Sequence, residues 1–242
     1  MVYLEKVTKS FSGKKAVQQI SLGAKEGEIL GLVGTNGSGK TTTLKMIVGL
    51  LQPDEGRIEV NGIDRLQEPV RARHFMGYAP EAPYLYDYLS GADYLRFVGQ
   101  ARGLAEAEAR QTAQSLLKFF DLLSAKDDLM RHYSYGMKKK ISVASAFVGS
   151  PRVLILDEPT EGLDTFAVAR LSEKLQGLRA QDKTILVASH TTPFLAEICD
   201  RLVILHNGRL MGSVEMSGFS AEERQIRLEQ TYAHFVQGEK RK

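Results

Sequence analysis

Short apolar runs, separated by segments with the period of a helix, cover much of the second half of the chain, and one more such run lies near residue 30. Apolar runs of this length that are joined by helices are typical of strands buried on both faces of a parallel sheet. We expect buried strands over residues 28–33, 152–157, 183–189 and 201–206. The helices expected beside them cover residues 41–51, 164–180 and 192–199.

The first 24 residues have a looser alternation of apolar and polar positions, which predicts two or more antiparallel strands. The apolar members of this pattern are Val2, Leu4, Val7, Val17, Ile20 and Leu22. Residues 52–56 predict a turn, because they contain proline and glycine. Strands are then expected over residues 57–60 and 75–79, and Pro80 stops the second of them.

Residues 85–149 differ from the rest of the chain, because they contain helical patterns and few strand signals. The helices expected here cover residues 90–101, 105–120 and 134–148. After the last buried strand, Asn207 and Gly208 predict a hairpin turn. A capping-box sequence then predicts a final helix over residues 221–236, and the charged residues 239–242 are expected to form a solvated tail.

These patterns predict an α/β fold in a single domain, and a chain of 242 residues is long enough to bury such a core. Residues 1–84 and 150–215 would form a core with a mostly parallel sheet and an N-terminal antiparallel β subdomain. Residues 85–149 would form an inserted helical subdomain, and residues 216–242 a C-terminal helix and tail.

The segment between the first buried strand and its helix fits the phosphate-binding P-loop pattern G-x-x-x-x-G-K-[ST]. It consists of Gly34, Thr35, Asn36, Gly37, Ser38, Gly39, Lys40 and Thr41. Glycines let backbone N–H groups turn toward an anion, and the helix N-terminus adds a partial positive charge. Lys40 is expected to reach the β- and γ-phosphates, and the Thr41 hydroxyl to bind Mg²⁺. A chance glycine-rich turn is the alternative, which the flanking strand and helix disfavour.

Two carboxylates end the apolar strand 152–157, at the edge where a P-loop fold keeps its catalytic groups. Asp157 is expected to hold Mg²⁺, and Glu158 to accept a proton from the attacking water. A pair of surface carboxylates is the alternative. His190 follows the strand 183–189 of the same sheet, where it can contact the γ-phosphate and hold Glu158 in place. A lone histidine after a strand is, however, more often structural.

Composition and charge narrow the classes of partner. The net charge of +3 is too small to indicate a dedicated nucleic-acid-binding protein. No apolar run approaches the roughly 18 residues of a membrane-spanning helix, and residues 1–6 do not resemble a signal peptide. The single cysteine, Cys199, predicts a buried thiol in a reducing compartment. We therefore expect a cytoplasmic protein, with any membrane role supplied by another chain.

The order of these motifs resembles the ATP-binding subunits of ABC transporters. The P-loop is followed by the pair Asp157 and Glu158, by residues 161–164 and by His190, as in that family. Residues 133–137 lie at the start of a predicted helix in the inserted subdomain, where the family keeps its signature sequence. The resemblance extends over about residues 2–215, and it implies that the cofactors are ATP and Mg²⁺.

The same resemblance implies roles for further residues. Three of them would contact the nucleotide bound by the same chain: Phe11, Val17 and Thr42. The ring of Phe11 would stack on adenine. Glu81 occupies the position of a glutamine that contacts Mg²⁺ and couples to the membrane subunit. In family members two subunits face each other head to tail around ATP. Ser134 and Gly136 would bind the γ-phosphate of the nucleotide held by the other subunit. Asp164 would lie in the loop that crosses the dimer interface.

Four positions depart from the usual family sequence. They are Tyr135 in place of glycine, Met137 in place of glutamine, Glu81 in place of glutamine, and Glu161 in place of serine or asparagine. None of them removes a chemically required group, so an active ATPase is expected. The resulting signature resembles the exporter branch, with membrane permease subunits and a second ATP-binding subunit, identical or not, as partners. The protein would then sit peripherally at the inner face of the membrane.

Two alternatives stay open at this point. One is a soluble ATPase of the same family, for example in iron–sulfur assembly; the other is an assembly module that binds ATP without useful turnover. Glu158 favours turnover over the second alternative, because such a module has no need of a general base.

Overall fold

The computed structural model describes residues 1–238, and the tail expected at 239–242 lies outside the described residues. A four-stranded antiparallel sheet, in the order β2-β1-β4-β5, lies beside a six-stranded sheet in the order β10-β9-β3-β8-β7-β6. The strands of the antiparallel sheet are β1 (Val2–Phe11), β2 (Lys14–Ala24), β4 (Glu55–Val60) and β5 (Ile63–Asp64). Those of the larger sheet are β3 (Ile29–Val33), β6 (Met76–Ala79), β7 (Val153–Asp157), β8 (Thr184–Ala188), β9 (Arg201–His206) and β10 (Arg209–Glu215).

The larger sheet is parallel except for the pairing of β9 with β10. Every residue of β3, β7 and β8 is buried, as the continuous apolar runs predict. The turn at Asn207 and Gly208 joins β9 to β10, so the predicted hairpin is confirmed. The mixed α/β fold, with one antiparallel and one mostly parallel sheet, is therefore confirmed.

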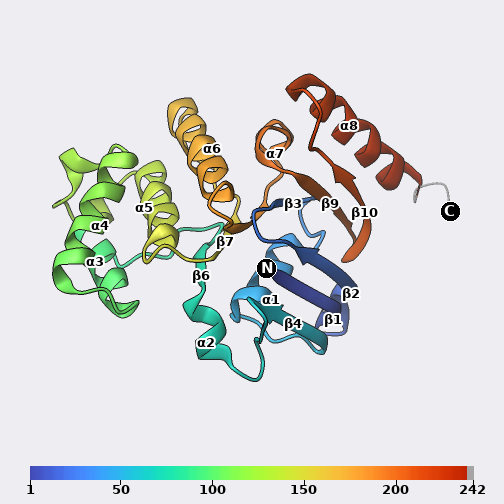
Figure 1. The fold of residues 1–242 in the computed structure, drawn as a ribbon, viewed down its shortest axis with the longest axis horizontal. Helices are drawn as coiled ribbons and strands as arrows, with labels where there is room; N and C mark the ends of the chain where they lie inside the picture. The colour runs from blue at the N-terminus through green and yellow to red at the C-terminus, as the bar shows by residue number, and fades with distance from the viewer. Residues whose placement is uncertain (239–242) are drawn as a thin grey trace.

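Each predicted helix is present in the structure, with shifts at its ends (Figure 1). They are α1 (Lys40–Val48), α2 (Pro69–His74), α3 (Gly91–Ala101), α4 (Glu106–Phe119), α5 (Tyr135–Phe147), α6 (Thr165–Arg179), α7 (Thr192–Ile198) and α8 (Ala221–Gly238). The helix predicted over 41–51 ends three residues early, because Gly49 adopts the left-handed conformation (φ 86°) that terminates helices. The short helix α2 had no counterpart among the predicted elements.

Figure 1 shows α3, α4 and α5 gathered at one end of the molecule, away from the antiparallel sheet and α8. This group corresponds to the helical insertion expected over 85–149. Its last helix, α5, packs on β6 and β7 and so connects the insertion to the larger sheet. None of the helices within residues 1–238 is long and apolar enough to span a bilayer.

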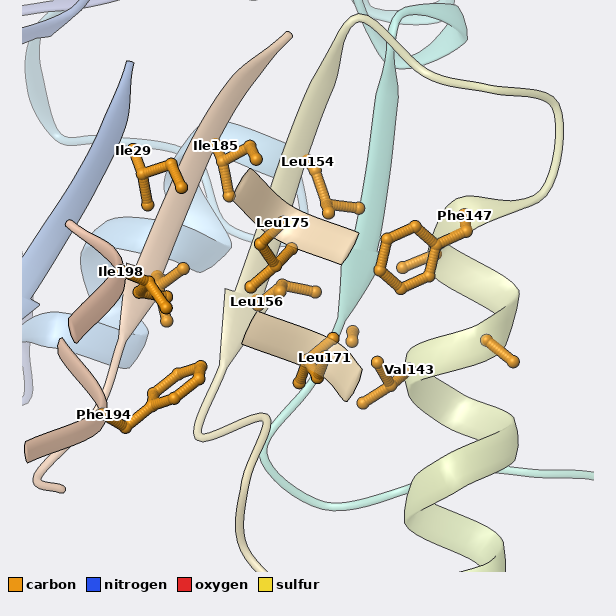
Figure 2. Close-up of a cluster of buried hydrophobic side chains, with 14 of the residues drawn as sticks. Ile29, Val143, Phe147, Leu154, Leu156, Leu171, Leu175, Ile185, Phe194 and Ile198 are labelled. Carbon is orange, nitrogen blue, oxygen red and sulfur yellow. The ribbon is translucent and has the colours of Figure 1, made fainter. Parts of the chain in front are cut away.

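The larger sheet separates two hydrophobic clusters. Along β7, Leu154 and Leu156 face α5, α6 and α7, as Figure 2 shows, whereas Val153 and Ile155 belong to the cluster on the opposite face. That second cluster includes residues of α1 and of the antiparallel sheet, Leu44 and Ile58 among them. Burial of each aliphatic side chain stabilises the fold by on the order of 1.5–3 kcal/mol. The two clusters therefore hold the strands of the larger sheet in place from both faces.

Close contact between β6 and α5 yields a first prediction. A Cβ atom on Gly77 would meet the backbone carbonyl oxygen of Ala146, which cannot rotate away. Gly77→Ala should therefore lower the free energy of unfolding by about 1–3 kcal/mol, measured by chemical denaturation. Gly23→Ala is the matched control, because its Cβ would meet Tyr3 at an ordinary 3.6 Å. Equal stability of the two variants would contradict this packing.

Candidate active site

The P-loop connects the end of β3 to the start of α1, and its glycines are required by its shape. Gly39 precedes α1 with φ 105°, and a Cβ atom there would lie 2.8 Å from the Ala16 carbonyl oxygen. Gly37 also has a positive φ, of 78°. In α1, which lies wholly within the described residues, no side chain caps the N-terminus and the first turn holds no acidic residue. The N–H groups at this end are therefore free of side-chain acceptors, which favours an anion.

Lys40 folds back into the loop that carries it. Its ammonium group donates to the carbonyl oxygens of Gly34, at 2.7 Å, and Thr35, at 3.2 Å, and the residue is only 6% exposed. Burial lowers the pKa of Lys40, and the negative charges of Glu158, Asp157 and Glu81 oppose that shift. The loop thus holds a positive charge ready for a phosphate.

A pocket of about 830 Å³ opens in front of this loop. Its lining includes nine of the residues expected at the nucleotide: Phe11, Asn36, Gly37, Gly39, Lys40, Thr41, Thr42, Glu81 and Glu158. Phe11 ends β1 with 45% of its surface exposed, so its ring is available for stacking. The pocket therefore joins an aromatic residue, a phosphate-binding loop and two carboxylates in one concave surface.

The expectation for Val17 differs from what the structure shows. Val17 is fully buried and packs in the hydrophobic cluster, whereas its neighbours Ala16 and Gln18 line the pocket. Strand alternation explains the difference, since successive side chains of β2 point to opposite faces. The structure does not bring the Val17 side chain to the nucleotide pocket.

Sequence reasoning missed other residues of this pocket. Lys14, Lys15 and Asn207 line it, although none belongs to a recognised motif. The adjacent Lys14 and Lys15, three and four residues after Phe11, were the available signal for an anion. The turn that contains Asn207 also supports the P-loop, because Gly208 N–H donates to the Ser38 carbonyl oxygen at 3.0 Å.

Asp157 ends β7 as a completely buried carboxylate. Neither of its oxygens makes a hydrogen bond of normal geometry within the described residues. Burial is the largest cause that raises the pKa of Asp157 to about 6; Glu81 and Glu158 add to the rise, and the Thr41 hydroxyl and Lys139 oppose it. Buried oxygens without hydrogen bonds are costly, so a cation is a favourable partner for this carboxylate.

These donors fit Mg²⁺. Asp157 and the Thr41 hydroxyl are near each other, and Glu81 lies on the wall of the same pocket. No group of three His, Cys, Asp or Glu side chains among the described residues could hold a metal ion by itself. Mg²⁺ commonly takes one or two protein oxygens and fills its shell with phosphate and water, so the oxygen donors of Asp157, Thr41 and Glu81 suit it.

Glu158 follows in a left-handed conformation, with φ 45°. Its Oε2 atom accepts hydrogen bonds from Ser189 Oγ, at 2.8 Å, and from the His190 backbone N–H, at 3.2 Å. His190 Nδ1 lies 3.0 Å from the same oxygen. The structure therefore brings the expected Glu158 and His190 together, and it adds Ser189 as a partner that the sequence did not indicate.

Lys139 is a further residue that sequence reasoning missed. It lies in α5 and is fully buried. Its ammonium donates to the carbonyl oxygens of Pro80 and Glu81, at 3.1 and 2.6 Å, and of Asp157, at 3.3 Å. Burial lowers its pKa, against the pull of four neighbouring carboxylates. It is the middle one of three consecutive lysines, and the sequence alone does not show which of them faces inward.

Ser134, Gly136 and Asp164 lie outside this pocket of their own chain. Ser134 caps α5 by accepting from the Met137 N–H at 3.2 Å. Asp164 caps α6 by accepting from Ala167 N–H at 2.8 Å. Because their expected ligand is a nucleotide bound by a second subunit, their role stays a prediction.

Comparison with known proteins places this geometry in a family. The sequence profile of the ABC transporter family matches residues 17–161, from β2 to the loop after Glu158. The chain belongs to the ABC transporter family. It is the ATP-binding subunit or domain of such a transporter, and ATP-binding domains of this family are ATPases.

Curated relatives agree with this assignment. NatA, an ABC transporter ATP-binding protein of Bacillus subtilis, is 33% identical over 87% of this chain and 88% of its own length. The Nod factor export ATP-binding protein I of Paraburkholderia xenovorans is 37% identical over 92% of this chain and 73% of its own. The rat ATP-binding cassette sub-family A member 7 is 36% identical over 89% of this chain, which spans only 10% of that protein.

A solved ATP-binding subunit of an ABC transporter superposes with a TM-score of 0.85 and 32% identity, covering 95% of this chain and 99% of the other. The ABC-type fold is thus shared over nearly the whole of both chains.

The buried Asp157 predicts an unusual dependence of stability on pH. Its pKa in the folded protein is above the ordinary 3.8, so the folded state holds more protons and stability falls as pH rises from about 4 to 6. Asp157→Asn removes this cost and should stabilise the nucleotide-free protein at pH 8 by up to about 3 kcal/mol, but not near pH 4. Thermal unfolding at both pH values measures this difference.

Asp54→Asn is the control, because its exposed carboxylate has a pKa lowered by hydrogen bonds from Lys9 and the Ser10 N–H. That variant should gain nothing at pH 8. A stabilisation of Asp157→Asn that is the same at pH 4 and pH 8 would show that ionisation of Asp157 is not the cause.

Proposed function

We propose that this ATP-binding subunit hydrolyses MgATP and powers export through separate membrane permease subunits. The observation that carries the hydrolytic part is Glu158, held by Ser189 and His190 at the wall of the pocket that Lys40 lines. In this position a carboxylate can act as a general base beside a bound triphosphate. The nucleotide would stack its adenine on Phe11 and place its phosphates on the P-loop.

In the proposed reaction Glu158 accepts a proton from water, and the water oxygen attacks the γ-phosphorus. The bond from that phosphorus to the bridging oxygen breaks, and ADP leaves. Lys40 balances the phosphate charge, and Ser189 and His190 keep the Glu158 carboxylate in place. When bound, Mg²⁺ neutralises charge on the phosphates, and Thr41, Asp157 and Glu81 would supply its protein ligands.

We further propose that two ATP-binding subunits, identical or not, enclose the nucleotides between them. Ser134 and Gly136 lie at the exposed N-terminus of α5, away from the pocket of their own chain. They would meet the γ-phosphate bound by the other subunit, and Asp164 would lie beside them at the contact. The export direction is supported by the signature sequence and by the likeness to a Nod factor export ATP-binding protein.

Permease subunits would dock on an aromatic patch beside Glu81, and the protein would thereby sit at the inner face of the membrane. The patch consists of Tyr84, Tyr86, Tyr88 and Phe97, which are between 49% and 78% exposed. Its members lie on α3 and on the loop that leads from Glu81 to α3. The rings of Tyr86 and Phe97 lie 6.1 Å apart. Exposed aromatic residues are enriched at protein interfaces, so a cytoplasmic segment of a permease is the expected occupant.

Glu158→Gln tests hydrolysis and the dimer together. It removes the general base and should lower kcat about 10²–10⁴-fold, while the affinity for ATP stays unchanged. With MgATP the variant should shift from monomer to dimer, measured by light scattering after size exclusion. A wild-type rate equal to that of the variant would instead support a nucleotide-gated module without useful turnover.

Tyr84→Ser combined with Tyr88→Ser tests permease docking. The double variant should keep the ATPase activity of the isolated subunit, yet a smaller fraction should sediment with the membranes of cells that contain its permease. Val70→Ser is the control, because Val70 is 74% exposed in α2, outside the aromatic patch. Undiminished sedimentation of the double variant would place the permease elsewhere.

A further inference from the structure

One ammonium group connects three segments that are separate in the sequence. Lys139, in α5, donates hydrogen bonds to Pro80 and Glu81 in the loop after β6, and to Asp157 at the end of β7. All three acceptors are main-chain carbonyl oxygens, so the three N–H donors of the lysine are matched by three acceptors. Each bond has a charged donor, which makes it stronger than a bond between neutral groups.

The bond to Asp157 acts on the peptide unit that carries Glu158. The carbonyl oxygen of this peptide accepts from Lys139 at 3.3 Å, and its N–H donates to the Ala188 carbonyl oxygen at 2.8 Å. Both edges of the peptide plane are therefore held. Glu158 has φ 45°, a conformation that non-glycine residues keep only where their surroundings impose it.

We propose that Lys139 is a positioning residue for hydrolysis, which fixes the Glu158 backbone and ties it to the loop that carries Glu81. The shortest of its bonds, 2.6 Å, goes to the Glu81 carbonyl oxygen. That loop continues into the aromatic patch, so a shift of the patch would reach Glu158 through a single side chain. Since the readout is turnover, this role rests on the proposed ATPase function.

Stability alone does not account for a lysine here. A fully buried ammonium without a direct carboxylate partner loses much of its hydration, and apolar side chains of similar size often stabilise such sites as well or better. Replacement by methionine, which has nearly the same length, should therefore leave the fold intact. A role in positioning predicts instead that turnover falls while folding and ATP binding persist.

The first test compares Lys139→Met with Lys139→Gln and with Lys138→Met. Lys139→Met should lower kcat about 10²-fold, with the dissociation constant for ATP and the melting temperature close to those of the wild type. Lys139→Gln keeps two N–H donors and should recover part of the rate. Lys138 is the matched control, because it is the neighbouring lysine of α5 and pairs with Asp87 at the surface, 2.9 Å away.

The second test asks whether Lys139 acts through Glu158. In single-turnover reactions, Lys139→Met should add no further loss to a Glu158→Gln protein, because the group that it positions is already gone. Losses that multiply would overturn the proposed role. So would a wild-type kcat in folded Lys139→Met and Lys139→Gln.

Hydrogen exchange separates this role from the ATPase function itself. In Lys139→Met, or in Lys139→Gln if the methionine variant does not fold, the Glu158 amide should exchange faster than in the wild type, while β3 exchanges at the same rate. Unchanged exchange at Glu158 would refute the role of Lys139 whatever the turnover. A wild-type subunit that does not hydrolyse ATP, together with faster exchange at Glu158 in the variant, would refute the ATPase function and leave the positioning intact.

Discussion

The candidate active site depends on one constraint, which is that parallel strands begin and end at the same edges of a sheet. β3, β8 and β7 are neighbours in the larger sheet and run in one direction. Their carboxyl ends therefore deliver the P-loop, Ser189 with His190, and Asp157 with Glu158 to one edge. Because β8 lies between the other two strands, its two polar residues meet Glu158 directly. Burial of both sheet faces then keeps these ends in register.

This edge concentrates charge that the protein alone balances poorly. Lys40 and Lys139 are buried ammonium groups whose hydrogen bonds go to backbone carbonyls, whereas Asp157 is a buried carboxylate without a hydrogen bond of normal geometry. Burial of each charge costs free energy, since buried charges are stable only when paired. In the proposed function a bound triphosphate would face Lys40, and Mg²⁺ would face Asp157. The site therefore favours a ligand that offers an anion to Lys40 and a cation to Asp157.

Residues whose role follows from local sequence could be predicted, and those whose role follows from packing could not. The P-loop, Asp157 and Glu158 were located because a strand, a turn and a helix lie next to each other in the chain. For Val17 the resemblance implied a contact with the nucleotide, but strand alternation puts its side chain in the core. Lys139 was missed for the opposite reason. Nothing in a run of three lysines shows which one faces inward, since that depends on how α5 lies against β6 and β7.

Two of the departures from the usual family sequence, Tyr135 and Glu161, can be explained by their contacts. Tyr135 lies over Gly162, where a Cβ atom would be only 2.7 Å from the ring, and burial together with the nearby Glu161 raises the pKa of its hydroxyl. Two unusual residues are thus partners in one contact. Gly136 packs on the Gly162 carbonyl oxygen, and the Lys140 ammonium lies 3.0 Å from Asp164. Contacts of Tyr135, Gly136 and Lys140 therefore join the first two turns of α5 to the loop before α6. A second subunit would meet these two segments as a single surface, so a substitution in either one alters both.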